Sequence, residues 1–305
     1  MFAKVTNFFS DIHKAFLSRH IYFPMIIFKL DTQLQAHIQK LKFAGESIGF
    51  VPTMGALHEG HIQLVKEAIK TSDICVVSIF VNPTQFNIKE DLINYPVTTS
   101  ADIELLEKNG CHILYLPSEE VIYPTNDTQK LSYDIGPIEH LLEGAFRPGH
   151  YKGVVQVVNI LLKTLMPDIL LLGAKDYQQC KVLTQFAAKH YPDMKVRMVA
   201  TVRAESGLAL SSRNKRLSAE ELEIAPYIYK CLLNIKEQLQ DVDLTDLENE
   251  AISTLIKSGL QPEYVVIANA NNLEKVVHWD GETKLVALVA AKLGAVRLID
   301  NLELN

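Results

Sequence analysis

Between residues 45 and 199, short apolar segments alternate along the chain with segments whose apolar positions recur every three or four residues. Short apolar segments rich in β-branched residues are typical of buried strands, and the recurring pattern is typical of amphipathic helices. The pattern predicts strands over 48–51, 74–81, 113–116, 169–172 and 196–199, and helices over 61–70, 102–108, 154–166 and 177–190. This alternation predicts an α/β fold, a Rossmann-like parallel sheet with helices on both faces.

The pattern changes after residue 202. A polar loop leads to Ser218, whose spacing from Glu221 is that of a capping box and predicts the start of a helix. The rest of the chain predicts helices over 219–239 and 244–258, then strands over 264–267, 284–289 and 295–298. Helices followed by strands indicate a smaller C-terminal α+β domain, so we expect one domain over 25–201 and a second over 202–305.

Residues 1–24 fit neither expected domain. They mix aromatic residues with Lys4, Lys14 and Arg19, and Asp11 interrupts any signal-peptide core. We interpret them as a mobile, dispensable N-terminal extension; an amphipathic helix that touches a membrane surface is the alternative. No uninterrupted apolar run reaches the roughly 18 residues that a membrane span needs, so we expect no membrane partner.

Composition narrows the function classes. With 305 residues, 48% hydrophobic and 22% charged, the chain is an ordinary globular protein, which excludes disordered, collagen-like and coiled-coil proteins. The net charge of −6 argues against broad nucleic-acid binding, so any anionic ligand must meet a local cluster of cations and amides. The four cysteines have no zinc-like spacing, and we interpret them as buried thiols in a reducing cytoplasm.

Ligands of open parallel sheets bind beyond the carboxyl ends of the strands, where this sequence places three polar clusters, and a fourth lies at the domain junction. In the first, His58 and His61 lie at the start of a helix, whose free N–H groups and positive end favour phosphate oxygens. Gly55 and Gly60 allow close backbone approach of a nucleotide. The cluster matches no dinucleotide, Walker or zinc-protease motif. Two surface histidines beside a turn glycine are the structural alternative.

The second and third clusters follow the next strands. Asn82 and Gln85 flank a proline turn and are within reach of a carboxylate or hydroxyls, although Asn-Pro also commonly opens a plain turn. Lys175 lies at a helix start, where its charge is unfavourable unless an anion is present. Helix capping alone explains Asp176, and Gln179 shares its face of the helix.

The fourth cluster, residues 210–214 (LSSRN), lies at the domain junction. Two hydroxyls and a guanidinium on a flexible loop could close over a polyphosphate and supply donors where charge accumulates. A solvated linker is the alternative.

Together these clusters resemble the pantothenate synthetase (pantoate–β-alanine ligase) family. The resemblance rests on residues 50–61 (FVPTMGALHEGH), 80–86 (FVNPTQF), 144–150 (GAFRPGH) and 207–214 (GLALSSRN), and it extends from about Met25 to the C-terminus. Residues 58–61 also look like the "HIGH" signature of the nucleotidyltransferase superfamily, which includes class I aminoacyl-tRNA synthetases.

The resemblance implies an enzyme that condenses (R)-pantoate with β-alanine, through pantoyl adenylate, to give pantothenate, AMP and pyrophosphate. Pantothenate is a precursor of coenzyme A. The resemblance further implies ATP as co-substrate, Mg²⁺, a cytoplasmic homodimer, an ATP- and pantoate-binding N-terminal domain and a C-terminal lid. We expect small-molecule substrates and no nucleic-acid partner.

The resemblance also implies site residues. His61 would be the proton donor, with His58, Lys175 and Arg213 as further catalytic groups. The ATP site would comprise Met54, Gly55, Ala56, Leu57, His58, Glu59, Gly60, His61, Gly173, Ala174, Lys175, Asp176, Val202, Leu210, Ser211, Ser212 and Arg213. The substrates would meet Gln85 (pantoate and β-alanine), Gln179 (pantoate), Asn82, Val157 and Val158, and Asp102 would be an outer ligand of Mg²⁺.

Three positions depart from the family pattern: Val97, Ala174 and Ser206. They replace residues that are usually charged, but none is a proposed catalytic group. Two other functions stay open from the residues themselves. One is a non-catalytic ATP-responsive binding protein, and the other is an adenylyltransferase for a different acid or a nucleotide acceptor.

Overall fold

The computed structural model describes residues 24–87, 89–124 and 133–305. The expected mobile extension, residues 1–24, therefore lies outside the described residues except for Pro24. Among the described helices, none has both the length and the apolar character that crossing a lipid bilayer requires.

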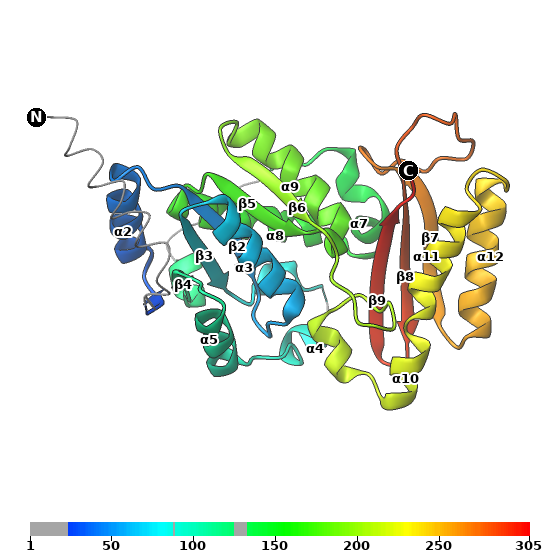
Figure 1. Ribbon diagram of the computed structural model, residues 1–305, viewed down its shortest axis with the longest axis horizontal. Helices are drawn as coiled ribbons and strands as arrows, with labels where there is room; N and C mark the ends of the chain where they lie inside the picture. Colours follow the sequence, from blue (N-terminus) through cyan, green and yellow to red (C-terminus); the bar gives the residue numbers. More distant parts are fainter. Residues whose placement is uncertain (1–23, 88, 125–132) are drawn as a thin grey trace, which may run out of the picture.

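Within the described residues, six strands form one parallel sheet with the spatial order β1-β4-β3-β2-β5-β6 (Figure 1). Its strands are β1 (Ile26–Phe28), β2 (Ile48–Thr53), β3 (Ile74–Ile79), β4 (Ile113–Tyr115), β5 (Ile169–Gly173) and β6 (Lys195–Val199). After β2, the chain adds β3 and then β4 on one side of β2, and later adds β5 and β6 on the opposite side. The sheet order therefore reverses between β2 and β5, which is where such sheets form a ligand crevice.

Helices cover both faces of this sheet, as predicted. The helices of this part of the chain are α2 (Asp31–Phe43), α3 (Glu59–Thr71), α4 (Lys89–Ile93), α5 (Thr99–Lys108), α6 (Glu119–Ile122), α7 (Leu142–Phe146), α8 (His150–Leu165) and α9 (Tyr177–His190), with 3₁₀ turns η1 (Pro83–Gln85), η2 (Pro137–His140) and η3 (Ala174–Asp176). Successive strand residues face opposite layers, so Phe50 packs in the core with α2, α8 and α9, whereas Val51 packs with α3 and α5. Both residues are fully buried, which explains the continuous apolar strands.

The C-terminal domain is α+β, as predicted. Helices α10 (Ala219–Ile224), α11 (Tyr227–Glu237) and α12 (Leu244–Lys257) follow the 3₁₀ turn η4 (Ser212–Arg216), and a described three-stranded antiparallel sheet contains β7 (Gln261–Asn269), β8 (Leu285–Leu293) and β9 (Val296–Glu303). Its helices and sheet share their own hydrophobic core. The domain boundary at residues 201–202 stays a prediction.

Two local predictions need correction, and two elements were missed. The single helix expected over 219–239 is two helices, because Pro226 lacks the N–H that would continue α10 into α11. The helix expected from residue 61 begins at Glu59, with His58 as its N-cap. The edge strand β1 and helix α2 were not predicted; β1 has only three residues, and they are partly or well exposed, so its apolar signal is weak.

Strand β9, red in Figure 1, joins the two domains through its contacts with the η3 turn that follows β5. The Asn301 amide donates to the carbonyl oxygens of Ala174 (2.9 Å) and Lys175 (2.8 Å), and the Tyr177 hydroxyl donates to Glu303 (2.9 Å). The C-terminal domain therefore sets the position of the η3 turn, which carries Lys175.

Gly153 on α8 packs against the turn that carries Gln85. A Cβ atom at Gly153 would lie 2.5 Å from the Thr84 carbonyl oxygen, so alanine there forces the helix and the turn apart. We predict that Gly153→Ala destabilises the protein by about 1–3 kcal/mol, as overpacking does, although alanine favours helices over glycine. Urea unfolding measures this, with the exposed α8 variant Lys163→Ala as control. A Gly153→Ala variant as stable as the parent protein would contradict the predicted clash.

Candidate active site

The loop after β2 is held by a buried carboxylate. Gly55 and Ala56 both have positive φ angles (82° and 49°), which turns their neighbouring N–H groups toward α5. Asp102, only 2% exposed, accepts from the Ala56 N–H (2.9 Å) and the Leu57 N–H (2.8 Å), and Thr98 donates to it as well (3.0 Å). Because both carboxylate oxygens are engaged by the loop, Asp102 is an anchor of the loop. Its role as an outer Mg²⁺ ligand stays a prediction.

His58 and His61 form a capping box at the start of α3, in which each side chain accepts a hydrogen bond from a backbone N–H group. Nδ1 of His58 accepts from the Gly60 N–H, and Nδ1 of His61 accepts from the His58 N–H, both at 3.2 Å. The ring centroids are 4.1 Å apart. In a neutral imidazole whose Nδ1 accepts, the proton lies on Nε2, so each ring has an Nε2–H donor for a ligand.

Burial keeps both rings neutral. It lowers the pKa of His58 to about 4, with help from the Lys175 charge, and lowers the pKa of His61 to about 3, with help from His58. At neutral pH the pair is therefore two uncharged hydrogen-bond donors. The predicted proton donor, His61, carries no proton beyond that of its neutral ring in the free protein.

These rings line a cavity of about 240 Å³ at the carboxyl ends of the strands. Most of the predicted site residues line it together: Met54, His58, Gly60, His61, Asn82, Gln85, Val157, Val158, Gly173, Lys175, Asp176, Gln179, Val202, Leu210, Ser211, Ser212 and Arg213. The cavity thus combines imidazole, ammonium and guanidinium groups with two glutamine side chains and an apolar wall from α8. Such a set suits a polyphosphate next to a small acid that has an apolar branch.

Other residues predicted at the ATP site are not among those that line this cavity. Gly55, Ala56 and Leu57 form the loop above Asp102. Glu59 pairs with Lys66 (2.8 Å) outside the cavity, and the Ala174 carbonyl is bound by Asn301.

Asn82 orients the neighbouring turn. It is 1% exposed; its Oδ1 accepts from Tyr123 (2.8 Å), and its Nδ2 donates to Gln85 Oε1 (3.2 Å) and the Gly153 carbonyl (3.1 Å). Its amide hydrogens are thus committed within the protein, so Asn82 positions Gln85 although it lines the cavity. Gln85 Nε2 contacts the Met54 sulfur, a weak acceptor that a substrate oxygen can replace.

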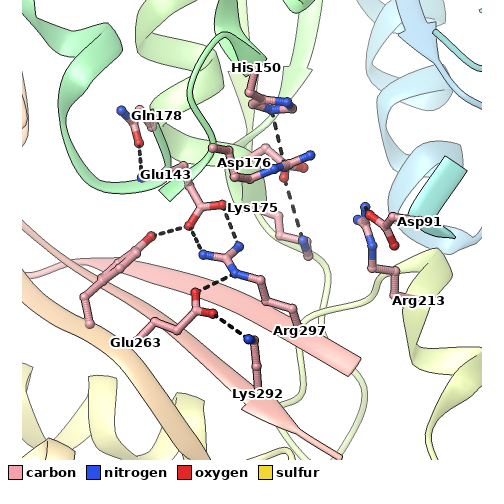
Figure 2. A network of polar contacts seen from close by, with 12 residues as sticks. Asp91, Glu143, His150, Lys175, Asp176, Gln178, Arg213, Glu263, Lys292 and Arg297 are labelled. Carbon is pink, nitrogen blue, oxygen red and sulfur yellow. Dashed lines mark hydrogen bonds and ion pairs between the residues drawn. The ribbon is translucent and has the colours of Figure 1, made fainter. Parts of the chain in front are cut away.

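The loop that carries Arg213 lies against the N-terminal domain. Ser212 donates to the Ala56 carbonyl (3.0 Å), and Arg213 pairs with Asp91 of α4 (3.2 Å; Figure 2). Asp91 also pairs with Arg216 (3.6 Å). The loop predicted to be flexible is therefore attached in this structure, through a partner, Asp91, that no local pattern in the sequence indicates.

Two further cavity residues had no predicted role. Arg147 and His150 come from the segment 144–150 at the start of α8, and both line the cavity. His150 Nδ1 lies 2.8 Å from the Gln85 carbonyl; a carbonyl only accepts, so the proton is on Nδ1. Burial lowers the pKa of His150 to about 4. The arginine and histidine of this segment were the signal that could have identified them.

The comparisons with known proteins agree with this geometry. A family model described as pantoate-beta-alanine ligase matches residues 26–303. The chain belongs to this family. It is 43% identical over 280 residues to the pantothenate synthetase of Stutzerimonas stutzeri (91% of this chain, 97% of the relative) and 42% identical to that of Bacteroides fragilis (88% and 95%).

Solved structures of the pantoate–β-alanine ligase family have the same fold. The pantothenate synthetase of Thermus thermophilus superposes with a TM-score of 0.85 at 35% identity, covering 92% of this chain and 99% of that one. The Francisella tularensis ligase, complexed with beta-gamma ATP and β-alanine, gives 0.74 at 38% identity, covering 92% and 97%. The predicted family and fold are confirmed. The chain is a pantoate–β-alanine ligase that forms pantothenate with ATP as co-substrate.

We predict that Asp102→Asn loosens the loop after β2. An asparagine presents one oxygen to two N–H groups and places its own NH₂ against the other. Losing a charge-assisted hydrogen bond in this way should destabilise the protein by about 1.5–3 kcal/mol and raise the KM for ATP. Urea unfolding and ATP titration of the rate measure both. Unchanged stability with an altered Mg²⁺ requirement would instead support the predicted metal-ligand role.

The neutral histidines also predict how stability depends on pH. The folded pKa values of His58 and His61 lie below the ordinary value of 6.5, so the unfolded chain binds protons first as the pH falls. Their contribution to stability is therefore complete above pH 6.5 and is lost between about pH 6.5 and pH 3. His61→Asn, which keeps an acceptor near the Nδ1 position, should lose less stability as the pH falls from neutral into the acid range. Urea unfolding of both proteins measures this, and equal pH dependence would contradict it.

Proposed function

We propose that the 240 Å³ cavity makes pantothenate in two steps at one site. In the first step, a pantoate carboxylate oxygen attacks the α-phosphorus of ATP; the new O–P bond forms as the bond to the β-phosphate oxygen breaks, and pyrophosphate leaves. In the second step, the β-alanine amine attacks the acyl carbon, AMP leaves, and the amine loses its proton. The supporting observation is that two Nε2–H imidazoles, Lys175 and Arg213 share a cavity with Gln85 and Gln179.

The side chains divide the work between charge and orientation. Because the pantoate carboxylate is already ionised, the first step mainly needs stabilisation of charge that accumulates on phosphate oxygens. The Nε2–H groups of His58 and His61 supply hydrogen bonds, and Lys175 and Arg213 supply positive charge. Gln85 and Gln179 would orient pantoate, whose methyl groups fit the wall formed by Val157 and Val158. His61 would act as a hydrogen-bond donor to the phosphates, becoming a proton donor only when their charge raises its pKa.

Mg²⁺ fits this site as a companion of the triphosphate. Among the described residues, no group of three or more His, Cys, Asp or Glu side chains could hold a metal by itself. Mg²⁺ is commonly held by one or two carboxylates together with phosphate oxygens, and Asp176 is a carboxylate that lines the cavity. Bound there, Mg²⁺ would offset phosphate charge.

The oligomeric state, the role of the C-terminal domain and the cellular location rest on the family resemblance and, for the location, on the cysteine thiols. We include a homodimer, a C-terminal domain that acts as a lid, and a cytoplasmic location. The last is supported by four buried free cysteines, which are typical of proteins kept in reducing compartments.

We predict that His61→Ala slows adenylate formation about 10²–10³-fold, the usual loss for one transition-state donor. Pantoate-dependent exchange of labelled pyrophosphate into ATP measures that step without β-alanine. The His278→Ala variant, outside both cavities, is the control and should exchange at the parent rate. Parent-like exchange by His61→Ala would refute its role, and exchange that does not require pantoate would refute the proposed acid.

A further inference from the structure

A second cavity of about 460 Å³ lies between the two domains and adjoins the first. The residues lining both cavities are Arg147, Lys175, Asp176, Ser211 and Arg213. Three cations therefore stand where the two cavities meet, and their pairing with carboxylates decides which of them is available to a ligand.

The arginines and lysines that line these cavities are paired with carboxylates, with one exception. The pairs within the cavity walls are Lys175–Asp176 (3.8 Å), Arg213–Asp91 (3.2 Å), Arg216–Asp91 (3.6 Å), Lys292–Glu263 (3.5 Å), Arg297–Glu263 (2.7 Å) and Arg297–Glu143 (2.6 Å). Within the described part of the chain, Arg147 is the cavity cation that has no carboxylate oxygen within 4.0 Å.

The contacts that Arg147 does make are long. Its Nη2 lies 3.4 Å from the Gln85 carbonyl, and its Nη1 lies 3.5 Å from Nε2 of His150. Burial lowers the pKa of Arg147, yet a guanidinium stays charged in proteins. A largely buried positive charge without a close counter-charge is costly, and an anionic ligand would offset that cost.

Glu143 is the acidic residue nearest to Arg147 in the sequence and lies one helical turn before it, since the Arg147 N–H donates to the Glu143 carbonyl (2.8 Å); side chains at this spacing are neighbours and can pair. The C-terminal domain prevents this pairing. Both carboxylate oxygens of Glu143 accept from Arg297 of β9 (2.6 and 2.7 Å; Figure 2). Tyr264 of β7 donates to Glu143 as well (2.7 Å). Glu263 holds Arg297 from its other side (2.7 Å). The network therefore engages Glu143 and leaves the Arg147 guanidinium for a ligand.

We propose that Arg147 binds the carboxylate of β-alanine, and that Arg297 is a positioning residue that keeps Glu143 from neutralising it. This inference rests on the proposed two-step function. The pantoate carboxylate is consumed in the first step, whereas the β-alanine carboxylate stays ionised throughout and needs a lasting counter-charge. Arg147 contacts the backbone of Gln85, the residue proposed to meet both substrates. The phosphates already have Lys175, Arg213 and the two histidines.

The test compares β-alanine with 3-aminopropanamide, which carries the same amine but no carboxylate. Arg147→Gln should lower kcat/KM for β-alanine roughly 10- to 100-fold, as expected for loss of a charge-assisted hydrogen bond, and leave the value for the amide unchanged. Pantoate-dependent pyrophosphate exchange, which needs no amine, should stay near the parent rate. The control is Arg197→Gln, on β6 and paired with Glu67 outside both cavities.

Equal losses for the two amines, a loss of pyrophosphate exchange, or no loss at all would each overturn the assignment. If Arg147→Gln does not fold, Arg147→Lys keeps the charge but loses the forked geometry. It should show a smaller loss that is again confined to β-alanine. If the proposed function itself were wrong, the parent protein would show no pantoate-dependent pyrophosphate exchange, and this result is distinct from any effect of the Arg147 variants.

The role of Arg297 has its own test. Arg297→Gln should release Glu143 toward Arg147 and raise the KM for β-alanine about tenfold or more, since it weakens the same charge-assisted contact. Adding Glu143→Gln to the same chain should restore that KM, while the melting temperature stays lowered because the contact between the domains is still lost. If the second substitution fails to restore the KM, Arg297 only stabilises the fold and the positioning role is wrong.

Discussion

The active-site cavity depends on the buried carboxylate of Asp102. It binds the two N–H groups that the positive φ angles of Gly55 and Ala56 turn toward it, and so it fixes the loop after β2. The first turn of α3, with its paired histidines, begins directly after that loop. The Ala56 carbonyl then accepts from Ser212, so the same loop also locates the segment that carries Arg213. One carboxylate thereby sets the relative positions of groups from both domains.

Burial and charge pairing together determine the chemistry of the cavity. Burial makes His58 and His61 neutral donors, which keeps their Nε2–H groups available without adding like charge beside Lys175. Most cations around the two cavities are balanced by carboxylates, many of them across the boundary between the domains. Contacts of β9 with Ala174, Lys175 and Glu143 mean that the C-terminal domain shapes the site without supplying most of its lining. A movement of this domain would therefore change both Lys175 and the surroundings of Arg147.

The sequence correctly predicted those elements whose residue pattern can arise from only one structural environment. Strands such as β3 are buried on both faces, so their apolar composition alone identifies them. The same reasoning failed for β1, which is short, exposed and paired only with β4 among the described strands. For Asp102 the sequence shows only a carboxylate in the first turn of a helix, which looks the same whether it binds a metal or a backbone loop. Only its partners, 45 and 46 residues away, distinguish the two roles.

By itself the sequence determined the fold class, the four polar clusters and the family, because each depends on residue types at fixed local spacing. The tertiary structure decided which of those residues face a ligand and which support their neighbours. Asn82, for example, became an orienting residue because its amide is bound by Tyr123 and Gly153. The tertiary structure also decided that Arg147 has no carboxylate partner among the described residues. Its nearest acidic neighbour in the sequence, Glu143, is bound by Arg297, which lies 154 positions away from Glu143. Charge compensation acts through space, so no local pattern could have revealed it.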